Sequence, residues 1–352
     1  MNYNEALNFI KEKESLGIQP GLTRIKSALD SLGNPQNDYK TIHIAGTNGK
    51  GTVAATISEA LCNGGYSVGL FTSPWVTDYR EQIQLNGNII SETDFANLID
   101  VIKDYECTEF ELITVAAYLY FSRNSVDYAV IECGMGGAED ATNTENENLA
   151  VITSISLDHT DFLGANIEKI AEQKAGILRK NCNCILYNSE LKRIFENRCK
   201  NVITIPEKNN LSLVNAVLKE IGLDTVDVLV NLPARHEIIG DVLLDGGHNV
   251  SAAEKLAPYL ENETAVIAML KDKNVEGYLS IIAPLCKTIV ATSVDSPRAM
   301  PSAELADIAE DYCDNVYICD NPEDAIKIEN LSLVCGSFYL AREIRKKLID
   351  EI

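Results

Sequence analysis

The stretch that decides the fold of the first half of the chain is Gly46-Thr47-Asn48-Gly49-Lys50-Gly51-Thr52. It follows an apolar run from Thr41 to Ala45 and leads into an Ala-rich helical pattern from Val53 to Leu61. A glycine-rich turn between a strand and a helix presents backbone N–H groups and the positive end of the helix dipole to an anion. The lysine of such a loop reaches the terminal phosphates, and the hydroxyl after it contacts Mg²⁺. The sequence therefore predicts a nucleoside triphosphate as ligand.

Length, composition and charge limit the classes of protein that remain. A chain of 352 residues, 46% of them hydrophobic, is long enough for two cores. The net charge of −22 and the lack of a basic cluster argue against nucleic acid or an anionic membrane as partner. The segment from Met1 to Ile10 has no signal-type apolar core, and scattered cysteines in apolar segments indicate reduced, buried thiols. We expect a cytoplasmic protein with small-molecule partners.

Strand patterns alternate with helical patterns twice along the chain, which is typical of parallel α/β sheets. The first series of strands is expected at Thr41–Ala45, Ser67–Thr72, Tyr128–Cys133, Leu149–Ser154 and Cys184–Tyr187. The second is expected at Val242–Leu244, Ala265–Met269, Thr288–Thr292, Val316–Cys319 and Leu331–Cys335. Pro233 and polar residues interrupt the pattern near the junction. The sequence thus predicts an α/β protein: a P-loop parallel-sheet ATPase domain over residues 1–232 and a smaller Rossmann-like α/β domain over residues 233–352.

Polar residues follow the predicted strands of the first domain at the edge where parallel sheets place their ligands. Ser73 follows the second strand, Glu132 ends the third, and Asp158-His159 follows the fourth. Oxygen atoms of Thr52, Ser73 and Glu132 suit Mg²⁺, and His159 could complete a second ion site. Each residue taken singly is an ordinary turn, strand-end or loop residue. Their shared location favours a metal and phosphate site.

The chain resembles the folylpolyglutamate synthase and dihydrofolate synthase family, a branch of the Mur ligases, through motifs in order over nearly its whole length. These motifs are Leu32–Gln36, His43–Thr52, Thr72-Ser73-Pro74, Asn86-Gly87, Glu132–Asn143, Asp158-His159, Leu163-Gly164, Lys174–Ile177, Leu244–Asn249 and Gly336–Tyr339. The resemblance implies an ATP-dependent amide ligase that uses Mg²⁺. We expect a monomer, although the sequence does not fix the oligomeric state. Its substrates would be L-glutamate and either dihydropteroate or tetrahydrofolate, whose carboxylate is activated as an acyl phosphate.

The resemblance also assigns roles residue by residue. It implies ATP contacts at Gly46, Thr47, Asn48, Gly49, Lys50, Gly51, Thr52, Asn215, Arg235 and Asp245. It implies metal ligands at Thr52, Ser73, Glu132 and His159, and catalytic roles for Lys50, Lys174 and His248. Lys174 matches a lysine that the family modifies to a carbamate, which replaces a cation that would repel Mg²⁺ by an anionic group. Without the resemblance, Lys174 would be interpreted as a surface lysine of a helix.

The remaining contacts that the resemblance implies are with the pterin part of the substrate. The residues that differ from the family pattern are expected near the same part. The implied contacts are Thr108, Phe110, Glu111 and Asp140. Trp75 stands where the family commonly has histidine, and Ala138-Glu139 replace the usual Arg-Leu. The segment between Lys174 and Arg235 is shorter than is usual in the family, so we expect some β structure of the first domain to be missing.

Two other functions remain open at this point. The first is a Mur-type ligase that joins an amino acid to a different acid, since the phosphate chemistry would be identical and only the acceptor pocket would differ. The second is a catalytically degenerate nucleotide-binding protein, which the shortened segment permits. Lys50, Glu132, His159 and Lys174 argue against the second function, because a protein without catalysis has no need of them.

Overall fold

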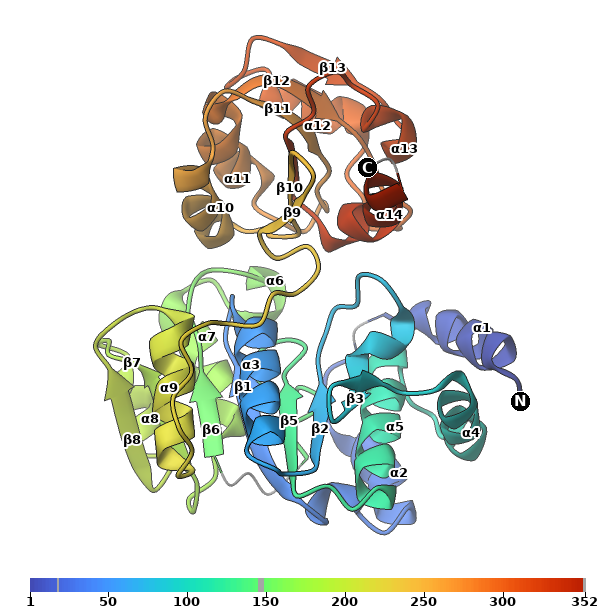
Figure 1. Ribbon diagram of the computed structural model, residues 1–352, viewed down its shortest axis with the longest axis vertical. Coiled ribbons are helices and arrows are strands. Elements are labelled where there is room, and N and C mark those ends of the chain that lie inside the picture. The colour runs from blue at the N-terminus through green and yellow to red at the C-terminus, as the bar shows by residue number, and fades with distance from the viewer. Residues whose placement is uncertain (18, 145–148, 351–352) are drawn as a thin grey trace. The chain divides into compact units, whose positions relative to one another are not determined.

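The computed structural model describes residues 1–17, 19–144 and 149–350, which form two compact units (Figure 1). The first unit comprises Met1–Pro74, Arg80–Ile155 and Leu163–Val230. The second comprises Asn231–Ile352 together with two short segments of the first half, Trp75–Tyr79 and Ser156–Phe162. The sequence did not predict that these two segments belong to the second unit. The domain boundary after residue 232 stays a prediction.

The first unit is built on an eight-stranded sheet of order β4-β3-β2-β5-β1-β6-β7-β8. The strands are β1 (Lys40–Ala45), β2 (Val68–Phe71), β3 (Ile83–Leu85), β4 (Asn88–Ile89), β5 (Tyr128–Glu132), β6 (Leu149–Ile152), β7 (Asn183–Tyr187) and β8 (Asn201–Ile205). All pairs from β2 to β8 are parallel, and β3 and β4 form an antiparallel edge. The predicted parallel α/β sheet is confirmed.

Strand β1 lies in the middle of this sheet and is buried over all but its first residue. Both faces of such a central strand are covered, so the polar Thr41 and His43 are buried as well as Ile42 and Ile44. Ile44 pairs with Glu132 of β5, and Ala45 pairs with Ile152 of β6. Because the three strands are parallel and in this register, the residues after β1 and β6 and the last residue of β5 meet at one edge.

Helices cover this sheet. They are α1 (Tyr3–Glu14), α2 (Thr23–Ser31), α3 (Lys50–Asn63), α4 (Glu92–Ile102), α5 (Glu109–Arg123), α7 (Ile167–Lys174), α8 (Lys192–Glu196) and α9 (Asn210–Glu220). Helix α3 packs against β2, β5 and α9, while α7 contributes Ile170 and Ala171 to the buried interior. A short helix, α6 (Thr160–Leu163), begins within the segment 156–162.

Three strands escaped the sequence prediction in the first unit. The hairpin of β3 and β4 turns at Asn86 and Gly87, which have φ of 51° and 76°. Positive φ at both positions identifies the turn that Asn-Gly favours between antiparallel strands, so this signal was present in the sequence. Strand β8 is mostly half-buried, and its β-branched residues from Val202 to Ile205, followed by Pro206, were a strand signal that was not used.

The second unit has a six-stranded sheet of order β13-β12-β11-β14-β10-β9, parallel except for the pair β10 and β9. Its strands are β9 (Glu237–Ile239), β10 (Val242–Asp245), β11 (Glu263–Ile267), β12 (Cys286–Ala291), β13 (Val316–Ile318) and β14 (Leu333–Cys335). Its helices are α10 (Val250–Leu256), α11 (Val275–Ile282), α12 (Ser302–Ala309), α13 (Pro322–Ala325) and α14 (Phe338–Asp350). All five strands predicted for this half are present, and β9 was missed.

The helices of the second unit lie on both faces of its sheet. Alternate residues of β11 enter two separate cores: Ala265 and Ile267 pack with α10, α11 and α12, whereas Val266 packs with α13 and α14. This two-sided burial is expected of a doubly wound α/β layer.

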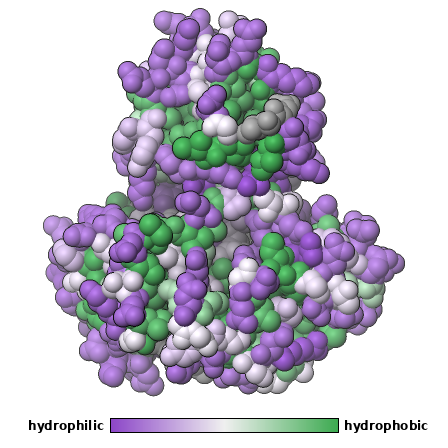
Figure 2. Space-filling view, in the orientation of Figure 1, coloured by the Kyte–Doolittle hydropathy of each residue, from purple (hydrophilic) through white to green (hydrophobic). Residues whose placement is uncertain are grey.

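The surface seen in Figure 2 mixes hydrophilic and hydrophobic residues on each unit. Exposed apolar side chains include Val228, Ile238 and Tyr317. Among the described residues, every helix is too short or too polar to cross a bilayer.

Glu237 of β9 and Arg345 of α14 join the edge of the second sheet to its last helix. Arg345 Nη2 lies 2.6 Å from Glu237 Oε1, and its Nε lies 2.9 Å from Oε2. Burial by itself would raise the pKa of Glu237, but hydrogen bonds from Arg345 and from the Ala234 N–H outweigh it and lower the pKa below its ordinary 4.5. The ionised form is therefore the one that stabilises the folded state.

We predict that Glu237→Gln lowers the stability of the second unit at pH 7 by about 1 kcal/mol. A depressed pKa contributes stability that is present above the unfolded-state value and is lost as pH falls through the folded-state value. The difference between wild type and variant should therefore be full above pH 4.5 and shrink below it. Thermal melts across this range, with Glu254→Gln at an exposed position as control, measure it. A difference that stays constant with pH would contradict the prediction.

Candidate nucleotide and metal site

The predicted phosphate loop connects β1 to α3 and is held by the chain that continues from β6. The Thr47 N–H donates to the Ser154 carbonyl at 2.7 Å, and the Asn48 N–H donates to Ser154 Oγ at 2.9 Å. Ser154 Oγ in turn donates to the Asn48 carbonyl at 3.1 Å. Ser154 thus fixes the first half of the loop. Sequence reasoning did not single it out, because no local signal links residue 154 to residue 48.

Two glycines of the loop are required by its geometry. A Cβ at Gly46 would lie 1.7 Å from Thr153 Oγ1, which is impossible for any larger residue without movement of the strand end. Gly49 has φ of 86° and precedes the first residue of α3, a left-handed conformation that glycine adopts without strain. Lys50 begins α3, and its Nζ lies 3.3 Å from the Thr47 carbonyl. The loop therefore curls over the start of the helix, and the lysine folds back along it.

Ser73 and Glu132 lie together beside this loop. Glu132 is 1% exposed, and its Oε2 accepts a hydrogen bond from the Ser73 N–H at 3.0 Å. A carboxylate buried this far beside Ser73, at the sheet edge from which the phosphate loop leads into α3, offers the hard oxygen ligands that Mg²⁺ prefers. The residues present therefore fit a magnesium ion. Thr52, Ser73 and Glu132 all belong to the first unit, whereas His159 belongs to the second.

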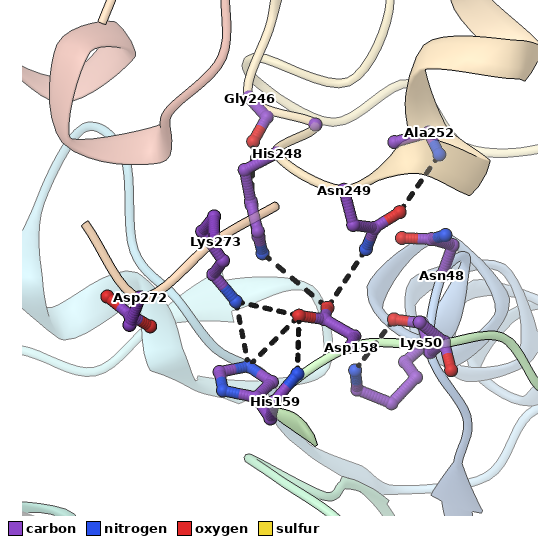
Figure 3. A network of polar contacts seen from close by, with 12 residues as sticks. Asn48, Lys50, Asp158, His159, Gly246, His248, Asn249, Ala252, Asp272 and Lys273 are labelled. Carbon is purple, nitrogen blue, oxygen red and sulfur yellow. Dashed lines mark hydrogen bonds and ion pairs between the residues drawn. The ribbon is translucent and has the colours of Figure 1, made fainter. Parts of the chain in front are cut away.

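His159 is part of a cluster that centres on the carboxylate of Asp158 (Figure 3). Lys273 Nζ lies 2.8 Å from Asp158 Oδ1 and 3.2 Å from His159 Nε2. Asn249 Nδ2 donates to Asp158 Oδ2 at 2.9 Å, and His248 Nε2 lies 3.8 Å from the same oxygen. The cluster is formed entirely within the second unit, where segment 156–162 meets the turns after β10 and β11.

The conformations of the cluster are tightly specified. His159 has φ of 49°, uncommon for a residue other than glycine, and its N–H donates to Asp158 Oδ1 at 2.8 Å. His248 Nδ1 lies 3.1 Å from the Gly246 carbonyl, which assigns the proton to Nδ1 and leaves a lone pair on Nε2. Asn249 caps α10 through its carbonyl oxygen, so its amide hydrogens face Asp158. Sequence reasoning missed Lys273 and Asn249 of this group.

The charge of Asp158 follows from these neighbours. Burial by itself would raise its pKa, but His159, Lys273 and His248 act in the opposite direction, and the net effect is a pKa well below the usual range for an aspartate. Asp158 is therefore a permanent carboxylate in the second unit.

Known protein families and solved structures match this chain over nearly its whole length. The model of the Mur ligase middle domain matches residues 44–253, and that of the Mur ligase glutamate ligase domain matches residues 234–337. A dihydrofolate synthase/folylpolyglutamate synthase of Bacillus subtilis is 29% identical over 98% of this chain and 99% of its own. The structure of Escherichia coli FolC with DHPP and ADP superposes with a TM-score of 0.88 at 26% identity, covering 100% of this chain and 98% of that one.

A further solved structure shows both nucleotide and metal in such a fold. It is the bifunctional folylpolyglutamate synthase/dihydrofolate synthase of Yersinia pestis with AMPPNP and a Mn ion, with a TM-score of 0.86 at 25% identity, over 99% of this chain and 98% of that one.

This chain is a Mur ligase. It belongs to the folylpolyglutamate synthase and dihydrofolate synthase branch, as its sequence motifs predicted. The alignment with the Bacillus relative extends over 427 positions, more than the 352 residues of this chain, so that relative contains residues which this Mur ligase lacks.

Lys174 of this Mur ligase is the last residue of α7 and is 2% exposed. The interpretation as a surface lysine, which the sequence alone favoured, is therefore wrong. The reason is tertiary: the Ala138 N–H donates to the Gln173 carbonyl at 2.8 Å, and a Cβ at Gly137 would touch the Lys174 carbonyl. The glycine-rich segment after β5 therefore lies against the end of this helix.

Asn215, Arg235 and Asp245, the implied ATP contacts outside the loop, each contact other residues of the protein. Asn215 of α9 bonds both the N–H and the carbonyl of Val226, at 2.8 and 2.9 Å. Asp245 ends β10 and accepts from the N–H groups of His236 and Gly247. Burial raises the pKa of Asp245 against the opposing effect of these hydrogen bonds. The Arg235 guanidinium lies 4.8 Å from the ring centre of Phe338. Their roles toward ATP stay predictions.

Three of the four residues implied for pterin binding lie at the start of α5, and the fourth, Asp140, lies in the segment after β5, where Gly134 meets the Phe110 ring. Thr108 and Glu111 make the reciprocal cap of α5, and Glu111 also pairs with Arg24 at 3.1 Å. Phe110 contacts Phe71, with ring centres 5.9 Å apart. These contacts account for the three residues as parts of the helix start, and their role toward a pterin stays a prediction.

Asp140 accepts hydrogen bonds within the segment that follows β5. Its carboxylate accepts from the Met135 N–H at 2.7 Å and from Thr142 Oγ1 at 2.5 Å. Thr142 Oγ1 also lies 2.8 Å from Nε2 of the buried His43, which is 3.0 Å from Cys133 Sγ. This network links β1 to the residues immediately after Glu132. Sequence reasoning did not assign a role to His43 or Thr142.

Trp75, the departure from the family pattern, is held within the second unit. The Arg342 guanidinium lies 3.5 Å from the centre of its ring and donates to its carbonyl at 3.1 Å. A cation stacked on the indole in this way favours tryptophan over histidine at this position. The substitution therefore has an explanation in packing.

We predict that Thr108→Ala lowers stability by about 1 kcal/mol, because it removes the side-chain cap of α5, and that Thr108→Ser does not. If Thr108 acts only as a cap, both variants keep the KM for the pterin substrate. Chemical denaturation and steady-state kinetics of the two variants measure this. The matched control is Ser91→Ala, which removes the cap of α4. A raised KM for the pterin in Thr108→Ala, without a change for ATP, would contradict a purely structural role.

Proposed function

We propose that this protein is an ATP-dependent ligase that adds L-glutamate to the carboxylate of dihydropteroate or of a folate. The observation that carries the proposal is the phosphate loop between β1 and α3, with Ser73 and Glu132 beside it, in a chain similar over its whole length to folylpolyglutamate and dihydrofolate synthases. ADP and AMPPNP in the solved relatives support ATP as the nucleotide.

The proposed reaction activates a carboxylate before an amine attacks it. A carboxylate oxygen of the acceptor attacks the γ-phosphorus of ATP, ADP leaves, and the resulting acyl phosphate has a good leaving group. The amine of glutamate then attacks the acyl carbon, inorganic phosphate leaves, and an amide forms. The N–H groups of the loop and the Lys50 ammonium offset negative charge that gathers on the phosphoryl group during transfer.

The ion of the proposed reaction would be Mg²⁺, held by Thr52, Ser73 and Glu132, with His159 toward a second ion. When bound, it would neutralise charge on the phosphate oxygens and align them for transfer. The Mn ion in the Yersinia relative supports a divalent cation at such a site. Within the second unit, Arg235 and Asp245 would contact the nucleotide.

His248 is proposed as the group that accepts a proton from the attacking glutamate amine. Its Nδ1 donates a hydrogen bond to the Gly246 carbonyl, so Nε2 carries the lone pair that a proton acceptor requires. The group that must lose a proton is the ammonium of glutamate, which is not nucleophilic while protonated.

Lys174 is proposed to carry a carbamate, which would turn a buried cation into an anion. Its burial supports this role, because a charged group is retained in the interior only where it has a function or a partner. We predict a carbamate signal in the ¹³C NMR spectrum after incubation with ¹³C-bicarbonate, and its loss in Lys174→Gln. The matched control is Lys169→Gln in the same helix. A spectrum without any signal that depends on Lys174 would contradict the proposal.

The decisive experiment is phosphate release by the purified protein with MgATP and glutamate, in the presence of dihydropteroate, tetrahydrofolate or neither, with mass spectrometry of the products. We predict release that depends on one or both pterins and a product heavier by one glutamate. Lys50→Ala should abolish both signals while its far-UV spectrum and melting curve stay unchanged. Product formation at the wild-type rate by Lys50→Ala would contradict the phosphate-loop assignment.

The same experiment separates the alternative acceptor. Trp75 and Ala138 depart from the family pattern on the pterin side, which is the observation that favours a different acid. ATP binding without stimulation by either pterin would exclude both pterins as acceptors and favour a Mur-type ligase for another carboxylate.

A further inference from the structure

The side chain of Asn210 lies against the phosphate loop, and neither the sequence motifs nor the proposed reaction gives this residue a role. A Cβ at Gly49 would lie 2.8 Å from Asn210 Oδ1 and 2.9 Å from its Nδ2. The carboxamide therefore fills the space in which a side chain at position 49 would lie. Gly49 thus meets two requirements at once, the left-handed φ of 86° and the room for this amide.

Two neighbouring helices bring Gly49 and Asn210 together. Strands β1 and β8 run parallel in one sheet, so α3 and α9, which follow them, begin at the same edge of that sheet and pack against each other (Figure 1). Gly49 directly precedes α3, and Asn210 is the first residue of α9. The residue before it, Asn209, accepts from the Ser212 N–H at 2.8 Å. Of the two adjacent asparagines, one caps its own helix and the other contacts the phosphate loop.

Tyr187, the last residue of β7, fixes the orientation of the Asn210 amide. Its hydroxyl donates to Asn210 Oδ1 at 3.2 Å. A carboxamide oxygen only accepts hydrogen bonds, so the phenol supplies the proton. Burial raises the pKa of Tyr187 to about 12, so the hydroxyl stays protonated at neutral pH. Tyr187 therefore holds the oxygen of Asn210 on its own side and opposes rotation of the amide away from Gly49.

The contact with Asn210 adds to the support that Ser154 gives the loop. Ser154 bonds the backbone of Thr47 and Asn48, the first half of the loop. Gly49 follows these two residues, and a glycine can adopt a wider range of φ and ψ than any other residue. Contact from Asn210 reduces that freedom at the point where the loop enters α3. The loop is therefore restrained from two elements, the chain after β6 and the start of α9.

We propose that Asn210, held by Tyr187, is a positioning residue of the phosphate loop. The pair keeps the Gly49 backbone in the left-handed conformation in which the loop presents its N–H groups to the phosphates of a nucleotide. No chemical step passes through either side chain. This inference rests on the proposed function, because it requires that the loop bind a nucleotide.

The test is calorimetric titration with MgADP of the wild-type protein, Asn210→Ala, Tyr187→Phe and the double variant. Asn210→Ala removes the contact with Gly49, and Tyr187→Phe removes only the oxygen that orients the amide. Each single variant should weaken MgADP binding by about three- to ten-fold, the effect expected for one hydrogen bond. The double variant should bind MgADP as weakly as Asn210→Ala alone, because Tyr187 acts through Asn210.

Two control variants separate this role from a general effect on stability. Asn183→Ala changes the residue at the opposite end of β7, whose side chain donates to Glu220 at 2.6 Å. Tyr120→Phe removes the hydroxyl of a half-buried tyrosine in α5. Both should leave the affinity for MgADP unchanged, whatever they do to the melting temperature.

Wild-type affinity for MgADP in both folded single variants would overturn the proposal. So would losses that add in the double variant, since the two residues would then act separately. Tyr187→Phe, which deletes one oxygen atom, keeps the test valid if Asn210→Ala disturbs the start of α9. A wild-type protein that does not bind MgADP would give a different result, because it would contradict the proposed function together with this inference.

Discussion

The parallel pairing of β1 between β5 and β6 is the constraint on which the candidate nucleotide site depends. Because the three strands run in the same direction and end in register, the phosphate loop, Glu132 and Ser154 are brought to one edge of the sheet. Ser154 then bonds the loop backbone, and Glu132 receives the Ser73 N–H. A shift of the register by one residue in any of these strand pairs would turn the side chains to the opposite face of the sheet, and the site would not form.

In the second unit, a cluster of polar side chains is centred on the carboxylate of Asp158. It is surrounded by an ammonium, an amide and two imidazoles, so its charge is balanced and its oxygens are fully used. The segment that carries it continues directly from the chain that holds the phosphate loop through Ser154. The five residues from Ser154 to Asp158 therefore contain both a support of the loop and the centre of the cluster.

The phosphate loop and the parallel sheet could be predicted because both depend on short local sequence patterns. The strand, glycine-rich loop and helix around Lys50 need only neighbouring residues, and the repeated alternation of strands and helices predicts a parallel sheet by a general rule. The hairpin at Asn86-Gly87 had a local signal as well. The β-branched run of β8, Val202 to Ile205, was a local signal of the same kind.

The sequence by itself determined the alternation of strands and helices in two series, the phosphate loop and the family to which the chain belongs. Only the tertiary structure decided that Lys174 is buried, that Thr108 and Glu111 cap a helix, and that Lys273 lies among Asp158, His159 and His248. The physical reason is the range of the interactions. Propensity, turn chemistry and loop motifs act over a few residues, whereas Lys273 meets Asp158 across more than a hundred positions, through sheet register and turns that no local pattern specifies.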